Sequence, residues 1–201
     1  MARFDLLCIG DSAVDIFALP DEADIHCQLH GKGAECELCL SAASKIPTKG
    51  FVLSFGGNAA NVAVAASRLG LKTSIYTHLG DDLFGKEVLE NFEKWGVNTS
   101  SVKLDKNHST NVNIVISYQG ERTILSSHQK REYELPELNS NWIYFSSLAP
   151  GHTVFHESFA ASLKKNGFKL VFNPGSYQVK EVLKTFRSLL MICEAFILNR
   201  E

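Results

Sequence analysis

The residues best suited to hold a small ligand lie in segment 55–70, FGGNAANVAVAASRLG. Gly56 and Gly57 have no side chains, so the backbone at this point can approach a ligand closely. The helix predicted to start at Asn58 directs its N-terminal amides toward the same ligand, with Asn58 and Asn61 in its first turn. Taken alone, the pattern also fits a tight strand-to-helix turn that binds nothing.

A second group of reactive side chains lies in residues 18–45, a polar segment with three of the five cysteines. Cys36 and Cys39 have the CxxC spacing of a zinc site, and His26 or His30 with Cys27 could complete a tetrahedral set. The second pair lacks a standard spacing, so a loop with free thiols is the alternative, and we expect no metal. We also expect no disulfide framework in a chain of this size without a signal peptide.

The elements that position these residues alternate between strand and helix. Glycine-bounded apolar runs and helical periodicity predict, in order, strands at 4–10 and 14–17, a helix at 58–69, a strand at 73–79, a helix at 83–95, a hairpin at 111–118 and 122–126, a strand at 142–148, a helix at 152–165, a strand at 168–173, a helix at 179–190 and a strand at 195–198.

This alternation predicts an α/β fold with a mostly parallel sheet flanked by helices. The hairpin and an exposed strand near residues 45–53 do not fit the alternation, and they suggest a small second β layer. Residues 18–45 are predicted to form an insertion or extended loop, with a short helix near 39–44.

Several motifs occur together in a fixed order. GGNAANVAVAASRLGLKTSIYTHLGDDLFG occupies residues 56–85, with GDSAVD at 10–15, GERTIL at 120–125 and FNPG at 172–175. In this order the motifs resemble those of the PfkB carbohydrate kinases, the ribokinase-like family. The resemblance covers nearly the whole chain except residues 18–45.

The resemblance implies a Rossmann-like, ribokinase-like core with a small β-sheet lid formed by excursions at about 14–55 and 110–127. It implies transfer of the γ-phosphate of ATP, with Mg²⁺, to a hydroxymethyl group of a sugar or nucleoside. It also implies the substrate-binding residues. Asp15 matches the sugar-binding aspartate, Gly56, Gly57 and Asn61 match the sugar-binding glycines and asparagine, and Asn58 stands where ribokinase has lysine.

The chemistry of these side chains agrees with that role. A carboxylate accepts two hydroxyl protons and an amide both donates and accepts, so together they can bind a polyol. The family's catalytic aspartate lies in a GAGD motif, and this motif does not occur in the 201 residues. Asn199 matches the first residue of the family's Asn-x-x-Glu segment, which helps organise metal and phosphate. We therefore expect residues 1–201 to be an incomplete domain, without the catalytic residue and the ATP site.

The composition limits the kinds of binding partner that we expect. Net charge is −2, with 45% hydrophobic and 21% charged residues, which does not favour nucleic acid or an anionic membrane surface. No targeting signal is predicted at the N-terminus, so we expect a cytoplasmic protein that binds a small molecule. The alternatives are a non-catalytic sugar-binding or regulatory module and a dimerisation module, with a homodimer formed through the lid.

Overall fold

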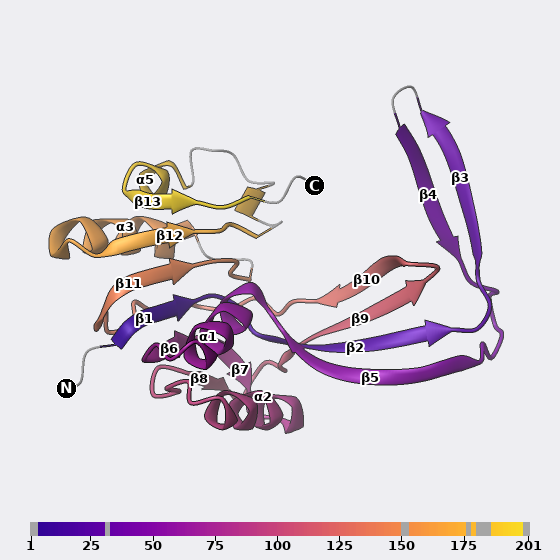
Figure 1. Ribbon diagram of the computed structural model, residues 1–201, viewed down its shortest axis with the longest axis horizontal. Helices are drawn as coiled ribbons and strands as arrows, with labels where there is room; N and C mark the ends of the chain where they lie inside the picture. Colours follow the sequence, from indigo (N-terminus) through magenta and orange to yellow (C-terminus); the bar gives the residue numbers. More distant parts are fainter. Residues whose placement is uncertain (1–3, 31–32, 150–152, 176–177, 180–185, 199–201) are drawn as a thin grey trace. The chain divides into compact units, whose positions relative to one another are not determined.

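The computed structural model describes residues 4–30, 33–149, 153–175, 178–179 and 186–198, and Figure 1 draws the elements along the chain. The strands are β1 (Phe4–Ile9), β2 (Ala13–Pro20), β3 (Asp24–His30), β4 (Gly33–Cys39), β5 (Thr48–Gly56), β6 (Thr73–Tyr76), β7 (His78–Gly80), β8 (Lys103–Asp105), β9 (Asn111–Tyr118), β10 (Glu121–Ser127), β11 (Ser140–Phe145), β12 (Lys169–Phe172) and β13 (Cys193–Phe196). The helices are α1 (Asn58–Arg68), α2 (Leu83–Lys94), α3 (Thr153–Asn166) and α5 (Arg187–Leu190).

The chain divides into two compact units. Unit 1 comprises Met1–Val14, Phe55–Asn111 and His128–Glu201, and unit 2 comprises Asp15–Ser54 and Val112–Ser127.

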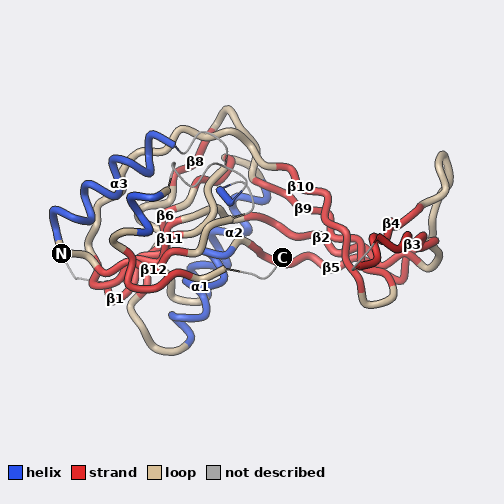
Figure 2. Tube along the Cα trace, turned by 90° about the horizontal axis from the view of Figure 1, so that it is seen from above, coloured by secondary structure: helices blue, strands red, loops and turns tan. Residues whose placement is uncertain are grey.

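Unit 1 is built on a five-stranded sheet with the order β13-β12-β11-β1-β6, in which all neighbouring strands are parallel. From β1 the chain passes through α1 to β6 on one side, and from β11 it passes through α3 to β12 on the other. Such crossovers are right-handed. Because the two crossovers run in opposite directions across the sheet, α1 and α3 lie on opposite faces. Figure 2 shows this arrangement of α1 and α3. The predicted α/β class with a mostly parallel sheet is confirmed.

The main core of unit 1 lies between α3 and one face of this sheet. The fully buried ring of Phe145 lies 5.1 Å from that of Phe159 and 5.4 Å from that of Phe172, measured between centroids. Ile9 of β1 belongs to the same cluster, whereas Cys8 is buried on the other face, as side-chain alternation along a strand requires. Helix α1 buries only small side chains, which lets it pack closely: Ala59, Ala60, Ala63 and Ala66.

One prediction for unit 1 needs correction. The strand predicted over residues 73–79 divides at Thr77 into β6 and β7, because β7 pairs in parallel with β8, a three-residue strand that we did not predict. Asp82 then caps α2 by accepting a hydrogen bond from the Gly85 backbone N–H at 2.8 Å. Of the helix predicted over 179–190, residues 180–185 lie outside the described residues.

Unit 2 holds most of a four-stranded sheet with the order β10-β9-β2-β5, and a separate two-stranded sheet of β3 and β4. Strands β9 and β10 form the predicted hairpin. Its turn has Gln119 at φ 51° and Gly120 at φ 86°. Positive φ at both central residues is what a type I′ turn requires, and that turn matches the twist of the paired strands.

The prediction of a loop and short helix in residues 18–45 is wrong. This segment continues β2 and then forms the β3–β4 hairpin, and residues 39–44 contain a turn instead of a helix. Apolar residues face each other across the hairpin, since Ile25 pairs with Leu38 and Cys27 with Cys36. Cross-strand pairs of this kind stabilise a hairpin, but their register is visible only once both strands are aligned.

Candidate functional site

The double glycine brings the start of α1 against the loop that follows β1. Gly57 has a φ of 98°, and a Cβ on it would overlap the backbone oxygen of Asp11 and lie 3.0 Å from Cα of Ser12. The backbone N–H of Asn61 donates to the carbonyl oxygen of Gly57 at 2.9 Å and closes the first turn of the helix. Only glycine fits this position, and the backbone that it lets approach is the loop after β1. The predicted close approach to a ligand stays a prediction.

The carboxyl ends of several strands of unit 1 meet at this turn. Asn173, which follows β12, accepts hydrogen bonds from Asn58 Nδ2 at 3.4 Å and from the Tyr144 hydroxyl at 2.8 Å, both at its Oδ1. Its own Nδ2 donates to the carbonyl oxygen of Ile197 at 2.9 Å. One asparagine side chain thus links α1, β11 and the segment after β13.

These contacts lie at the topological switch point of the sheet. The chain moves from β1 to β6 in one direction and from β11 to β12 in the other, and β1 and β11 are neighbours. Open α/β sheets bind ligands in the crevice outside the carboxyl ends of the strands at such a point. Of the predicted site residues, the structure brings Gly56, Gly57, Asn58 and Asn61 together here, and the side chains of Asn58 and Asn61 are exposed.

Asp11 is an acidic residue that we did not include among the predicted site residues. Its side chain is buried; Oδ1 accepts a hydrogen bond from the Tyr133 hydroxyl at 3.0 Å, and Oδ2 lies 3.7 Å from Nδ1 of His128. Burial, and next the charge of Asp11, raise the pKa of the Tyr133 hydroxyl, which therefore stays protonated as a donor. The carboxylate of Asp11 is thus engaged within the fold, although it belongs to the motif at residues 10–15.

A second cluster of titratable groups lies beside β7 and β8. Arg131 has a buried side chain that donates to Oδ2 of Asp105 at 2.9 Å and to the carbonyl oxygen of Ser109 at 2.6 Å. Burial opposes ionisation of Asp105, but hydrogen bonds from Asn107, His108 and Arg131 outweigh it and lower its pKa to about 2. This anchors the segment that precedes β9.

Near this cluster, burial and then the charge of Arg131 lower the pKa of His78 to about 4. The imidazole is therefore neutral at pH 7, and its Nε2 lies 3.0 Å from the Tyr76 hydroxyl. A neutral ring cannot supply a positive charge for binding phosphate.

Asp15 belongs to unit 2, where it is half-buried on β2. Its Oδ1 accepts a hydrogen bond from Nδ2 of Asn113 on β9 at 2.7 Å, and Oδ1 of Asn113 accepts one from the Ser126 hydroxyl on β10 at 2.7 Å. Neither partner was predicted from the sequence. The signal that could have drawn attention to Asn113 is an asparagine in a run of β-branched residues, where this residue type is uncommon.

The cysteine predictions also need correction. Cys27 and Cys36 form a disulfide, so neither sulfur is available to a zinc ion in this state. Cys36 and Cys39 lie three residues apart on β4, and alternation along the strand turns them to opposite faces. In the described part of the chain, no three His, Cys, Asp or Glu side chains converge as a metal site would require. Asn199 lies outside the described residues.

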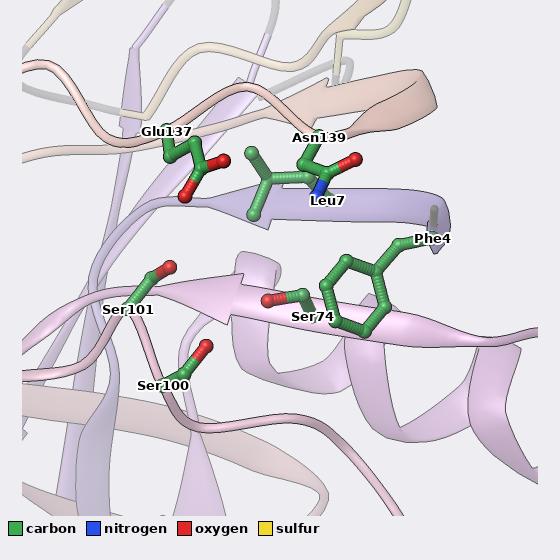
Figure 3. Close-up of a pocket in the computed structure, with 7 residues that line it drawn as sticks. All are labelled: Phe4, Leu7, Ser74, Ser100, Ser101, Glu137 and Asn139. Atoms are coloured by element: carbon green, nitrogen blue, oxygen red, sulfur yellow. The ribbon is translucent and has the colours of Figure 1, made fainter. Parts of the chain in front are cut away.

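A pocket of about 240 Å³ lies at the opposite end of the unit 1 strands from this turn (Figure 3). Its lining comes from the amino ends of the parallel strands and the loops beside them: Phe4, Leu7, Ser74, Ser100, Ser101, Glu137 and Asn139. Ligand sites in open α/β sheets lie at the carboxyl ends, so this pocket does not compete with the turn before α1.

No helix in the described part of the chain has the length and apolar character needed to span a bilayer.

Comparisons of the sequence with known proteins agree on one family. The family described as pfkB family carbohydrate kinase matches residues 28–201. The ribokinase of Haemophilus influenzae is 29% identical over 139 residues, which cover 64% of this chain and 45% of that protein. The chain thus spans less than half the length of that ribokinase.

Two solved structures show the same fold. The ribokinase of Giardia lamblia has a TM-score of 0.76 at 18% identity and covers 99% of this chain and 58% of its own. The nucleoside kinase of Methanocaldococcus jannaschii, titled an archaeal member of the ribokinase family, has a TM-score of 0.73 at 13% identity and covers 100% of this chain and 62% of its own. The predicted ribokinase-like fold is confirmed.

Proposed function

Because the chain belongs to the pfkB family of carbohydrate kinases, we propose that it binds a small sugar or nucleoside and presents a hydroxymethyl group for phosphorylation by ATP. The observation that carries this proposal is the turn of Gly56 and Gly57 at the switch point of unit 1. It opens a helix whose first turn carries two exposed amide side chains, Asn58 and Asn61. Amides both donate and accept, which suits hydroxyl groups.

We propose Asp15 as an acidic residue that also binds the substrate. An ionised carboxylate only accepts hydrogen bonds, so it can take protons from two sugar hydroxyls, and charge-assisted bonds of this kind are stronger than neutral ones. Strand β2 begins in unit 1 and runs directly into unit 2 at this residue. Unit 2 would serve as the lid over the substrate, which stays a prediction.

ATP and Mg²⁺ belong to the proposal for the whole protein. The residues proposed here bind the substrate, and the GAGD motif that carries the family's catalytic aspartate does not occur in the 201 residues. The described residues offer no converging set of metal ligands. Asn199 stays a candidate for organising metal and phosphate, and the cytoplasm stays the proposed location.

Calorimetry on the full chain with D-ribose, 2-deoxy-D-ribose, D-fructose and adenosine tests the proposal. We expect at least one of these ligands to bind, and Asp15→Ala to weaken its binding by roughly 100-fold or more, because two charge-assisted hydrogen bonds are lost. Asp21→Ala is the matched control, since Asp21 is an exposed aspartate of the same unit. Binding of no ligand, or equal affinity for wild type and Asp15→Ala, would contradict the assignment.

A second function is supported by the exposed apolar residues of unit 2. Phe51 is 68% exposed, and large aliphatic side chains on the same sheet are also open to solvent: Val52, Leu53, Ile114, Ile124 and Leu125. Exposed apolar groups of this extent are typical of interaction surfaces. We propose a homodimer through this sheet, which sedimentation of wild type and Phe51→Ser would test. Equal sedimentation of both as monomers would reject it.

A further inference from the structure

A row of three hydrogen-bonded polar side chains crosses the sheet of unit 2. Asp15 lies on β2, Asn113 on the adjacent strand β9 and Ser126 on β10. Both hydrogen bonds in the row measure 2.7 Å. Asn113 and Ser126 are also direct partners in the β9–β10 register. The row is therefore fixed by strand pairing, and it does not depend on a flexible loop.

The direction of each hydrogen bond in the row is determined by chemistry. An ionised carboxylate can only accept, so the amide nitrogen of Asn113 must face Asp15. The amide oxygen then faces Ser126, whose hydroxyl must donate. Ser126 thereby fixes the amide plane of Asn113, and Asn113 in turn fixes Oδ1 of Asp15. Among the described residues no hydrogen bond is made to Oδ2 of Asp15, which leaves that oxygen to accept from a ligand.

We propose that Asn113, held by Ser126, is a positioning residue that orients the Asp15 carboxylate for two adjacent hydroxyls of the substrate. This inference rests on the proposed function, because it concerns how Asp15 binds a sugar. A carboxylate held by one oxygen keeps its plane fixed, so Oδ2 and the remaining lone pair of Oδ1 face two neighbouring hydroxyls together. A ligand with only one hydroxyl at this position gains less from the fixed orientation. The row therefore favours a vicinal diol over its deoxy analogue.

Calorimetry with D-ribose and 2-deoxy-D-ribose on the full chain tests the inference. We expect Asn113→Ala to weaken ribose binding by about tenfold, because a hydrogen bond to a charged group is lost. Ser126→Ala is expected to weaken it by about threefold, and the double variant to match Asn113→Ala alone, because Ser126 acts only through Asn113. In Asn113→Ala, the ratio of the affinity for ribose to the affinity for 2-deoxyribose should fall toward one. Ser117→Ala, on the same strand β9, is the matched control.

The possible results distinguish failure of the proposed function from failure of this inference alone. If the wild type binds neither sugar and no other ligand of the panel, the proposed function fails and this inference fails with it. If the wild type binds ribose and Asn113→Ala binds it equally well, only this inference fails.

The remaining outcomes separate positioning from a structural role. Additive losses from Asn113→Ala and Ser126→Ala, or equal losses for both sugars, would show that Asn113 merely supports the strand. If Asn113→Ala does not fold, Ser126→Ala decides, since Ser126 is exposed and its removal leaves no buried cavity. Unchanged ribose affinity in that variant overturns the inference.

Discussion

Unit 1 has a core of fully buried large apolar side chains, whereas the large apolar side chains of the unit 2 sheet are mostly exposed or half-buried. The aromatic cluster under α3 is fully covered, with Phe145, Phe159 and Phe172 at its centre. In unit 2, Phe51 and Leu125 are more than half exposed. The difference indicates that unit 1 has its own hydrophobic core, while the unit 2 sheet lacks a covering layer of its own.

The same contrast holds for the two aspartates that lie four residues apart on the chain. Asp11 in unit 1 is buried and bonded to Tyr133, so its carboxylate serves the fold. Asp15 in unit 2 is half-buried and its Oδ1 is held by Asn113. Two identical side chains in one short motif thus have different environments, since Asp11 is buried against Tyr133 and His128 and Asp15 is only half-buried.

The largest expected difference between the units comes from truncating a phenylalanine in each. Phe145→Ala should lower the free energy of unfolding by about 3–5 kcal/mol, because it removes a fully buried ring and leaves a cavity. Phe51→Ala should lower it by less than about 1 kcal/mol, since that ring is largely exposed already. Denaturant unfolding followed by circular dichroism measures both. Equal losses would mean that unit 2 has a covering layer under these conditions.

A smaller effect is expected at the turn before α1. Gly57→Ala should cost about 2–4 kcal/mol, because the new methyl group meets the backbone of Asp11 and the residue has a positive φ. Gly70→Ala is the matched control, with a φ of 93° and open space around it, and it should cost only about 1 kcal/mol. Thermal unfolding of the two variants gives the comparison. Similar losses at both glycines would show that backbone strain, and not the close approach, makes Gly57 necessary.

The smallest effect is expected in the β3–β4 hairpin. Replacing Cys27 and Cys36 by serine removes the cross-strand disulfide and should destabilise the hairpin by about 2 kcal/mol. Cleavage by a glutamate-specific protease after Glu37 should then become faster, while the unfolding of unit 1 stays unchanged. Cys39→Ser is the control, because that thiol is free and lies on the same strand. Unchanged cleavage in the double variant would mean that strand pairing alone holds the hairpin.

Local signals in the sequence were enough to predict most of unit 1. Strands that end at glycine and helices with regular apolar spacing each depend on neighbouring residues, and the structure confirms them. The β9–β10 hairpin was predictable for the same reason, since its turn needs residues that tolerate positive φ. Residues 18–45 were mispredicted because the pairing of β3 with β4 depends on register, and polar residues there resemble a loop.

The sequence by itself determined the α/β class, the glycine turn at Gly56 and Gly57 and the ordered motifs of a carbohydrate kinase family. Only the tertiary structure decided how the side chains are used. The hydrogen bond from Tyr133 to Asp11 spans 122 residues, and that from Asn113 to Asp15 spans 98. Contacts over such distances follow from strand order and register, which no local pattern encodes, and they are what separate a buried aspartate of the fold from a candidate aspartate of the site.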